Sequence, residues 1–114
     1  MKETTDDMGS EFYCVVTTVD SLQLAERLES ESVKRRLAAC VQREERIVST
    51  YLWKDNVETS AEVRLVFKTT GGRTDALMEF IKTNHSYEVP EIVVLPIVDG
   101  SPDYLNWIRE SVKD

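Results

Sequence analysis

The sequence predicts an α+β domain in which two βαβ units share one antiparallel sheet. Strand-like and helix-like patterns follow in the order strand, helix, strand, strand, helix, strand, and a last helix closes the chain. Two strictly alternating runs, residues 47–53 and 61–68, flank a short polar break and indicate one long central β-hairpin. Right-handed crossovers interleave two such units into four antiparallel strands with both helices on one face, which is a ferredoxin-like βαββαβ sandwich.

The first half of the chain supplies one strand and one helix before the hairpin. Residues 12–18 are rich in aromatic and β-branched side chains, which favours a strand. We expect Asp20 to cap the following helix, with Gln23 in the capping-box position. Leu24 and Leu28 lie four residues apart and mark the apolar face of that helix.

The second half repeats this order after the hairpin. Thr74 is expected to cap a helix that His85 closes, and residues 92–97 form the next strand. Ser101 followed by Pro102 has the pattern of an N-cap and a first helical residue, which predicts a final helix through residue 107.

Length, charge and cysteine content restrict the class of protein. The 114 residues suit a single domain, which we place at residues 12–114 after a disordered acidic tail at residues 1–11. The net charge of −7 and the absence of a basic cluster argue against nucleic-acid or anionic-membrane partners. The longest apolar run is too short to span a bilayer, and the tail lacks the apolar stretch of a secretory signal. With two cysteines far apart in the sequence, a cytoplasmic protein is expected.

The length of the central hairpin predicts assembly. Each arm has roughly ten or more residues, about 33 Å at the usual strand rise, against roughly six in a typical strand. Arms this long, carrying Tyr51, Trp53 and Phe67, should extend beyond their own domain. Since an exposed strand edge invites pairing, a closed oligomer is the physical expectation.

Several segments together resemble the CutA family of divalent-cation tolerance proteins. The resemblance runs from about residue 12 to residue 112, with the motifs in the family's order and spacing. The matching segments are residues 36–41 (RLAACV), 51–53 (YLW), 62–69 (EVRLVFKT), 85–92 (HSYEVPEI), 95–97 (LPI) and 104–107 (YLNW).

The resemblance implies a homotrimer of ferredoxin-like subunits that acts in the response to divalent metals, copper above all. It also implies a metal site for Cu²⁺ or another divalent ion at Cys40, Glu62 and His85. We expect no organic cofactor. Two positions depart from the family pattern. Ser86 replaces the usual proline after the histidine, and Asp55 stands where the hairpin often has glycine.

The three candidate ligands also have ordinary structural explanations. Thiolate, imidazole and carboxylate groups suit copper and zinc, but these three residues come from different elements and could meet only in the fold. A cysteine in an Ala-Ala-Cys-Val setting is typical of a small buried residue, and His85 at a helix end would favour the helix dipole. Glu62, expected on the exposed face of the hairpin, could pair with Lys68, Arg64 or a neighbouring subunit.

Two alternative functions stay open. Tyr87, Glu88 and Lys68 could line an inter-subunit cleft for a small anion or a protein partner, as in similarly built PII signalling trimers. An acylphosphatase-like hydrolase on the same fold is the other alternative. The sequence contains no Ser-His-Asp order, HExxH, GxxxxGK[ST] or GxGxxG pattern, so we expect a binding protein and not an enzyme.

Overall fold

The order of secondary-structure elements agrees with the prediction. A computed structural model describes residues 10–113. Its elements are β1 (Phe12–Val19), α2 (Leu22–Lys34), β2 (Cys40–Trp53), β3 (Asn56–Thr70), the short 3₁₀ turn η1 (Gly71–Arg73), α3 (Thr74–Asn84), β4 (Ile92–Ile97) and α4 (Pro102–Ser111). The four strands form one antiparallel sheet in the order β2-β3-β1-β4, which is the order that two interleaved βαβ units produce.

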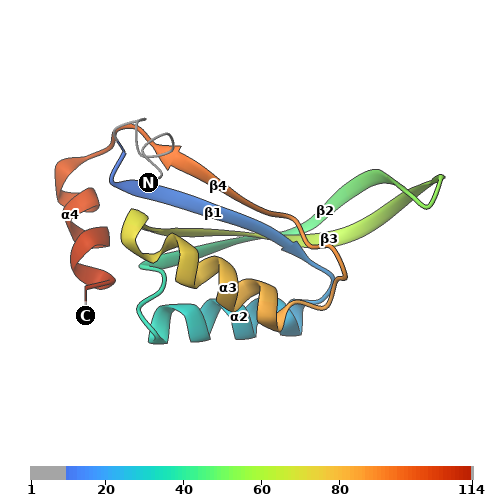
Figure 1. Cartoon of the computed structure of the whole chain (residues 1–114), viewed down its shortest axis with the longest axis horizontal. Coiled ribbons are helices and arrows are strands. Elements are labelled where there is room, and N and C mark those ends of the chain that lie inside the picture. Colours follow the sequence, from blue (N-terminus) through green and yellow to red (C-terminus); the bar gives the residue numbers. More distant parts are fainter. Residues whose placement is uncertain (1–9, 114) are drawn as a thin grey trace.

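The two faces of this sheet are covered differently. Helices α2 and α3 lie side by side on one face, as Figure 1 shows, and bury the main core against it. Helix α4 packs at one end of the opposite face, where it buries Ile108 and Val112 against Phe12. Because strand side chains alternate, Phe12 points to the α4 face and Val15 to the α2/α3 face. The fully buried large side chains of the main core are Val15, Val19, Leu28, Leu65, Phe67, Leu77 and Ile81.

Two of the predicted helix caps are wrong. Helix α2 is capped by Ser21, whose side chain accepts a hydrogen bond from the Leu24 amide at 3.1 Å, because Asp20 lies one residue too early. The Asp20 carboxylate instead accepts a hydrogen bond from the Ser86 hydroxyl at 3.0 Å. Thr74 is the first residue of α3, since η1 runs directly into the helix and leaves Arg73 at the cap position.

The cap predicted for the last helix is confirmed. Ser101 occupies the N-cap of α4, its side chain accepts a hydrogen bond from the Tyr104 amide at 3.3 Å, and Pro102 follows as the first helical residue.

The hairpin is longer than the alternating runs alone indicated. Its arms contain 14 and 15 residues, and it extends well past the helices in Figure 1. Lys54 and Asp55 form the two-residue turn, and both have left-handed backbone angles, φ 51° and φ 69°. Left-handed conformation at both positions defines the type I′ turn, which matches the twist of the strands it joins. A β-bulge between Glu44 and Ile47 shifts the register and lets the pairing continue to Cys40.

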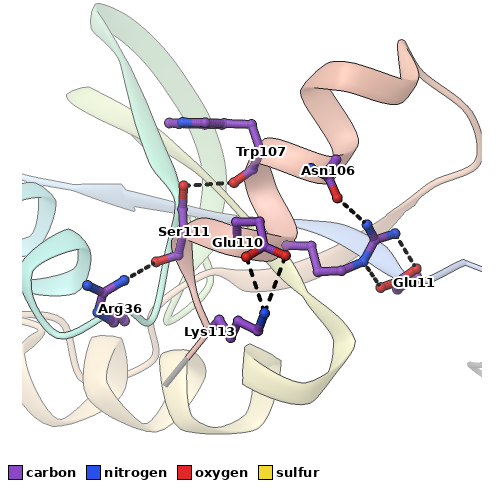
Figure 2. Close-up of polar contacts among 8 residues, drawn as sticks. Glu11, Arg36, Asn106, Trp107, Glu110, Ser111 and Lys113 are labelled. Carbon is purple, nitrogen blue, oxygen red and sulfur yellow. Dashed lines mark hydrogen bonds and ion pairs between the residues drawn. The ribbon is translucent and has the colours of Figure 1, made fainter.

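Most of the predicted tail, residues 1–9, lies outside the described part of the chain. Ser10 and Glu11 are described and contact the domain. The Ser10 hydroxyl donates to the Ile97 carbonyl at 3.1 Å. Figure 2 shows Glu11 accepting two hydrogen bonds from Arg109 on α4, at 2.7 and 3.0 Å. The Arg109 hydrogen bond lowers the pKa of Glu11. No helix within residues 10–113 has the length and apolarity needed to cross a membrane.

Candidate functional site

A cleft of about 760 Å³ lies between the half of the hairpin nearer its turn and the segment that precedes β4. Its walls come from β2, β3, the end of β1 and residues 87–91. The lining includes four glutamates and three aromatic residues, with no lysine or arginine among the described residues that form it. These side chains are Glu58, Glu62, Glu88, Glu91, Tyr51, Trp53 and Tyr87. The cleft is therefore acidic and partly aromatic, and it disfavours an anion.

Tyr87 joins two of the predicted site residues. Its hydroxyl donates a hydrogen bond of 2.6 Å to Glu62 Oε2, and its backbone N–H donates one of 3.1 Å to His85 Nδ1. The rings of His85 and Tyr87 are also in contact, with centroids 4.9 Å apart. Glu62, Tyr87 and His85, which we call the cleft triad, thus form one connected group that joins β3 to the segment between α3 and β4.

The hydrogen bonds of His85 fix its tautomer. Nδ1 accepts from the Tyr87 amide, so the ring proton lies on Nε2, which is 2.9 Å from the Thr18 carbonyl oxygen and donates to it. The Thr17 hydroxyl lies 3.2 Å from the same nitrogen and donates to the Glu91 carbonyl at 2.6 Å. Nε2 therefore holds the 85–91 segment against β1, while Nδ1 makes a hydrogen bond within that segment.

Tyr87 is held in its protonated form. Burial of the phenol, together with its hydrogen bond to the Glu62 carboxylate, raises the pKa of Tyr87 well above its ordinary value. The hydroxyl therefore acts as a donor at neutral pH, and the carboxylate that it contacts is shielded from solvent. Glu62 is only 8% exposed.

The whole folded region matches one protein family. Residues 13–111 match the model of the CutA1 divalent ion tolerance protein family. The chain belongs to the CutA1 family. Among curated relatives, a rice (Oryza sativa subsp. japonica) protein named "Protein CutA 1, chloroplastic" is 40% identical over 88% of this chain and 56% of its own length. The "Divalent-cation tolerance protein CutA" of Yersinia pestis (strain Pestoides F) is 37% identical over 86% of this chain and 82% of its own length.

A solved CutA structure has the same fold. The crystal structure of CutA from Xylella fastidiosa superposes with a TM-score of 0.89 at 34% identity, covering 91% of this chain and all of that one. The chain spans about half the length of the curated plant and mouse relatives that it matches. The resemblance inferred from the motifs is thus confirmed at the level of family and fold.

The structure of this CutA1-family chain brings together two of the three predicted metal ligands. Glu62 and His85 meet through Tyr87, whereas Cys40 pairs with Lys68 in the strand register. Lys68 lies six positions along β3 from Glu62, which places Cys40 roughly 20 Å from the cleft triad. Within residues 10–113, no group of three His, Cys, Asp or Glu side chains is arranged to hold a metal ion.

The predicted environment of Glu62 is wrong in part. We expected an exposed carboxylate paired with Lys68, Arg64 or a neighbouring subunit, but within the chain the partner is Tyr87. The 85–91 segment folds back over the start of the buried part of β3 and covers the carboxylate. Arg64 instead donates to Glu44 at 2.8 Å.

Of the three other cleft residues proposed from the sequence, two line the cleft and one lies elsewhere. Tyr87 and Glu88 line the cleft as expected, but Lys68 lies below α4, with its ammonium 5.6 Å from the centre of the Tyr104 ring. Sequence reasoning missed Glu58 and Glu91 as cleft residues. The register pairs Tyr51 directly with Glu58, and this pairing could be read only once the hairpin turn was located.

Proposed function

We propose that the chain is a divalent-metal-binding protein of the metal response, with Cu²⁺ as the bound ion and Glu62 and His85 as ligands. The cleft triad carries this proposal, because one tyrosine of the acidic cleft contacts both a buried carboxylate that lines the cleft and the imidazole of His85. Both donor types suit Cu²⁺. Metal binding at Glu62 Oε2 and His85 Nδ1 would require Tyr87 to break the hydrogen bonds that it donates to these two atoms.

The number of donors favours a site completed by a second chain. The triad supplies two ligand types, and in the same chain Cys40 is too far away to join them, so its role as a ligand requires another subunit. We therefore propose that the protein is a homotrimer. The projecting hairpin and exposed apolar residues on β4, Val93 and Leu95, support this assembly because they leave strand edges and apolar surface for a neighbour to cover.

We also propose that the protein is cytoplasmic and has no catalytic activity. Cys14 and Cys40 are both free thiols, which suits a reducing compartment. The description of the family as divalent ion tolerance proteins favours a binding role over an enzymatic one.

The metal proposal is tested by calorimetric titration of metal-free protein with Cu²⁺. Wild type should bind at a whole-number ratio per chain, and Glu62→Gln and His85→Ala should each weaken binding by about tenfold or more, because each removes a first-row-metal donor. Cys40→Ser should weaken binding only if another subunit supplies that thiol. Glu79→Gln, which changes an exposed glutamate on α3, is the matched control and should bind like wild type.

Unchanged affinity in both Glu62→Gln and His85→Ala would refute the assignment of these ligands. Circular dichroism of each variant separates lost binding from lost folding.

The size of the cleft favours a second candidate function. About 760 Å³ is far more than a metal ion needs and falls in the usual range for small organic ligands. A ligand-sensing trimer is therefore the alternative, although the four glutamates oppose the small anion expected from the sequence. Stoichiometric binding of a cationic or neutral organic ligand that displaces no Cu²⁺ would favour it.

A further inference from the structure

In Figure 1 the end of α2 and helix α4 lie at the end of the molecule opposite the hairpin turn. Residues of these two elements and of the connection to β2 line a second pocket. It has a volume of about 320 Å³ and shares no lining residue with the acidic cleft. Apolar side chains of Val33, Ala38 and Ala39 contribute to its lining. Its polar and aromatic residues are Lys34, Arg36, Ser111 and Trp107, and no carboxylate of the described residues lines it. In a chain of net charge −7, this is a local positive site.

The backbone holds Arg36 in an unfavourable conformation at this pocket. Helix α2 ends in a Schellman-type turn, in which the Leu37 amide donates to the Ser32 carbonyl at 2.9 Å and the Arg36 amide to the Val33 carbonyl at 3.0 Å. Arg36 occupies the position that is usually glycine, with φ 59°. Arg36 therefore carries its side chain at a position where glycine would fit the backbone at lower cost.

The guanidinium of Arg36 is positioned but not neutralised. Figure 2 shows one nitrogen, Nη1, donating to the Ser111 carbonyl on α4 at 3.2 Å. None of the ion pairs among residues 10–113 involves Arg36. Since a guanidinium has five N–H donors, most of its fork is available to an anion. The neighbouring Lys34 side chain is 74% exposed and pairs with Glu31 at 3.7 Å, so Arg36 is the cation of this pocket without a carboxylate partner among residues 10–113.

Trp107 supplies an aromatic wall next to these charges. Its side chain extends from α4 on the Ser111 side in Figure 2, and the residue is 46% exposed. Tyr104 stacks against the indole, with centroids 5.6 Å apart and an interplanar angle of 26°, which holds the ring in place. The indole therefore offers a half-exposed aromatic surface in the lining of the same pocket as Arg36.

We propose that this pocket binds a small aromatic anion. The aromatic ring of the ligand would lie against Trp107, and its carboxylate or phosphate would accept hydrogen bonds from Arg36 with support from Lys34. The volume, at the lower limit of ligand sites, admits a molecule with one or two rings. This site is independent of the metal proposal, because none of its residues belongs to the cleft.

The test uses the fluorescence of Trp107 in full-length protein carrying Trp53→Phe, which leaves one tryptophan. The probes are AMP for a phosphate ligand and nicotinate for a carboxylate ligand, with adenosine and nicotinamide as their uncharged counterparts. We expect saturable quenching by at least one anion, and at least about tenfold weaker binding of its uncharged counterpart. A response to AMP alone or to nicotinate alone identifies the anionic group. A Trp107→Phe protein, which retains Trp53, should show no quenching.

Arg36→Gly is the decisive variant. Glycine suits the left-handed position, so the turn should be kept while the guanidinium is removed, and affinity should fall by about tenfold to a hundredfold. Arg35→Gln is the matched control, because Arg35 carries the same charge but pairs with Glu31 and lies over Phe80 outside the pocket. Arg35→Gln should bind like the parent protein.

Three results would overturn the proposal: no saturable quenching by either anion, equal binding of the uncharged counterparts, or equal loss of affinity in Arg36→Gly and Arg35→Gln. Melting curves of both variants establish that the proteins compared are folded.

Discussion

Tyr87 is the residue on which the cleft depends most. Its hydroxyl contacts a buried carboxylate on β3, while its amide contacts the histidine that ends α3. A substitution that keeps the backbone therefore removes only the phenol contact. Glu62, only 8% exposed, would then lack its donor in the cleft triad.

We predict that Tyr87→Phe lowers the free energy of unfolding by about 1–3 kcal/mol at neutral pH, because a buried carboxylate loses its hydrogen bond. Urea denaturation followed by circular dichroism measures this change. Tyr104→Phe is the control, since no hydrogen bond is formed by the Tyr104 hydroxyl within residues 10–113. Equal stability of Tyr87→Phe and wild type would contradict the role given to this contact.

The pH dependence of stability gives a separate prediction for Tyr87. Burial and the Glu62 hydrogen bond raise the pKa of Tyr87 above the ordinary value of 10.0. The contact is therefore fully stabilising below the unfolded-state pKa, and its contribution is lost as the pH rises through the folded-state pKa. Between about pH 9 and about pH 11, wild type should lose more stability than Tyr87→Phe. Parallel losses in the two proteins, measured by denaturant midpoints, would argue against this linkage.

At the scale of elements, the hairpin turn is the clearest point of backbone strain. Lys54 and Asp55 both adopt left-handed angles that glycine or asparagine favours. We predict that Asp55→Gly raises the free energy of unfolding by about 0.5–1 kcal/mol, because glycine relieves the strain at that position. Thr59→Gly in ordinary strand conformation on β3 should instead lower it. A loss of stability in Asp55→Gly, measured by urea denaturation, would be inconsistent with the turn described.

Local patterns predicted the elements, but not how distant segments meet. Alternation of apolar and polar residues located the hairpin because one face of β3 is buried. The sequence Ser101-Pro102, an N-cap followed by proline, located the start of α4. The bulge beyond Glu44 has no such local signature, and neither has the extension of β2 back to Cys40. The cap of α2 was misplaced by one residue because Asp20 and Ser21 are both good capping residues.

The candidate site could be predicted only in part, because its residues lie on segments that are distant in the sequence. Glu62 and His85 belong to motifs that the family resemblance identifies, and the fold does bring them together. The burial of Glu62 depends on the tertiary contact between the 85–91 segment and β1, which no local pattern contains. The separation of Cys40 from the cleft triad follows from strand register, and register could be assigned only after the turn and the bulge were known.

At the scale of the whole molecule, one face of the sheet is incompletely covered within the described chain. Helix α4 covers only the end near Phe12. Exposed large apolar residues remain along β4 and the projecting half of the hairpin, among them Val48, Leu52, Val57, Val93 and Leu95. Our proposal is that copies of the chain cover these residues and complete the acidic cleft.

Association linked to folding makes thermal stability depend on concentration. We predict that the melting temperature rises with protein concentration over a hundredfold range, because mass action favours the folded trimer over unfolded chains. Differential scanning fluorimetry across that range measures the shift. A melting temperature independent of concentration would indicate that the folded chain does not need its neighbours.

The mass of the folded protein in solution tests the central claim most directly, since both the coverage of the sheet and the completion of the metal site require association. Size-exclusion chromatography with multi-angle light scattering at micromolar concentration should give three times the chain mass of 13.1 kDa. A mass of 13.1 kDa would contradict the trimer and, with it, the shared metal site at the cleft.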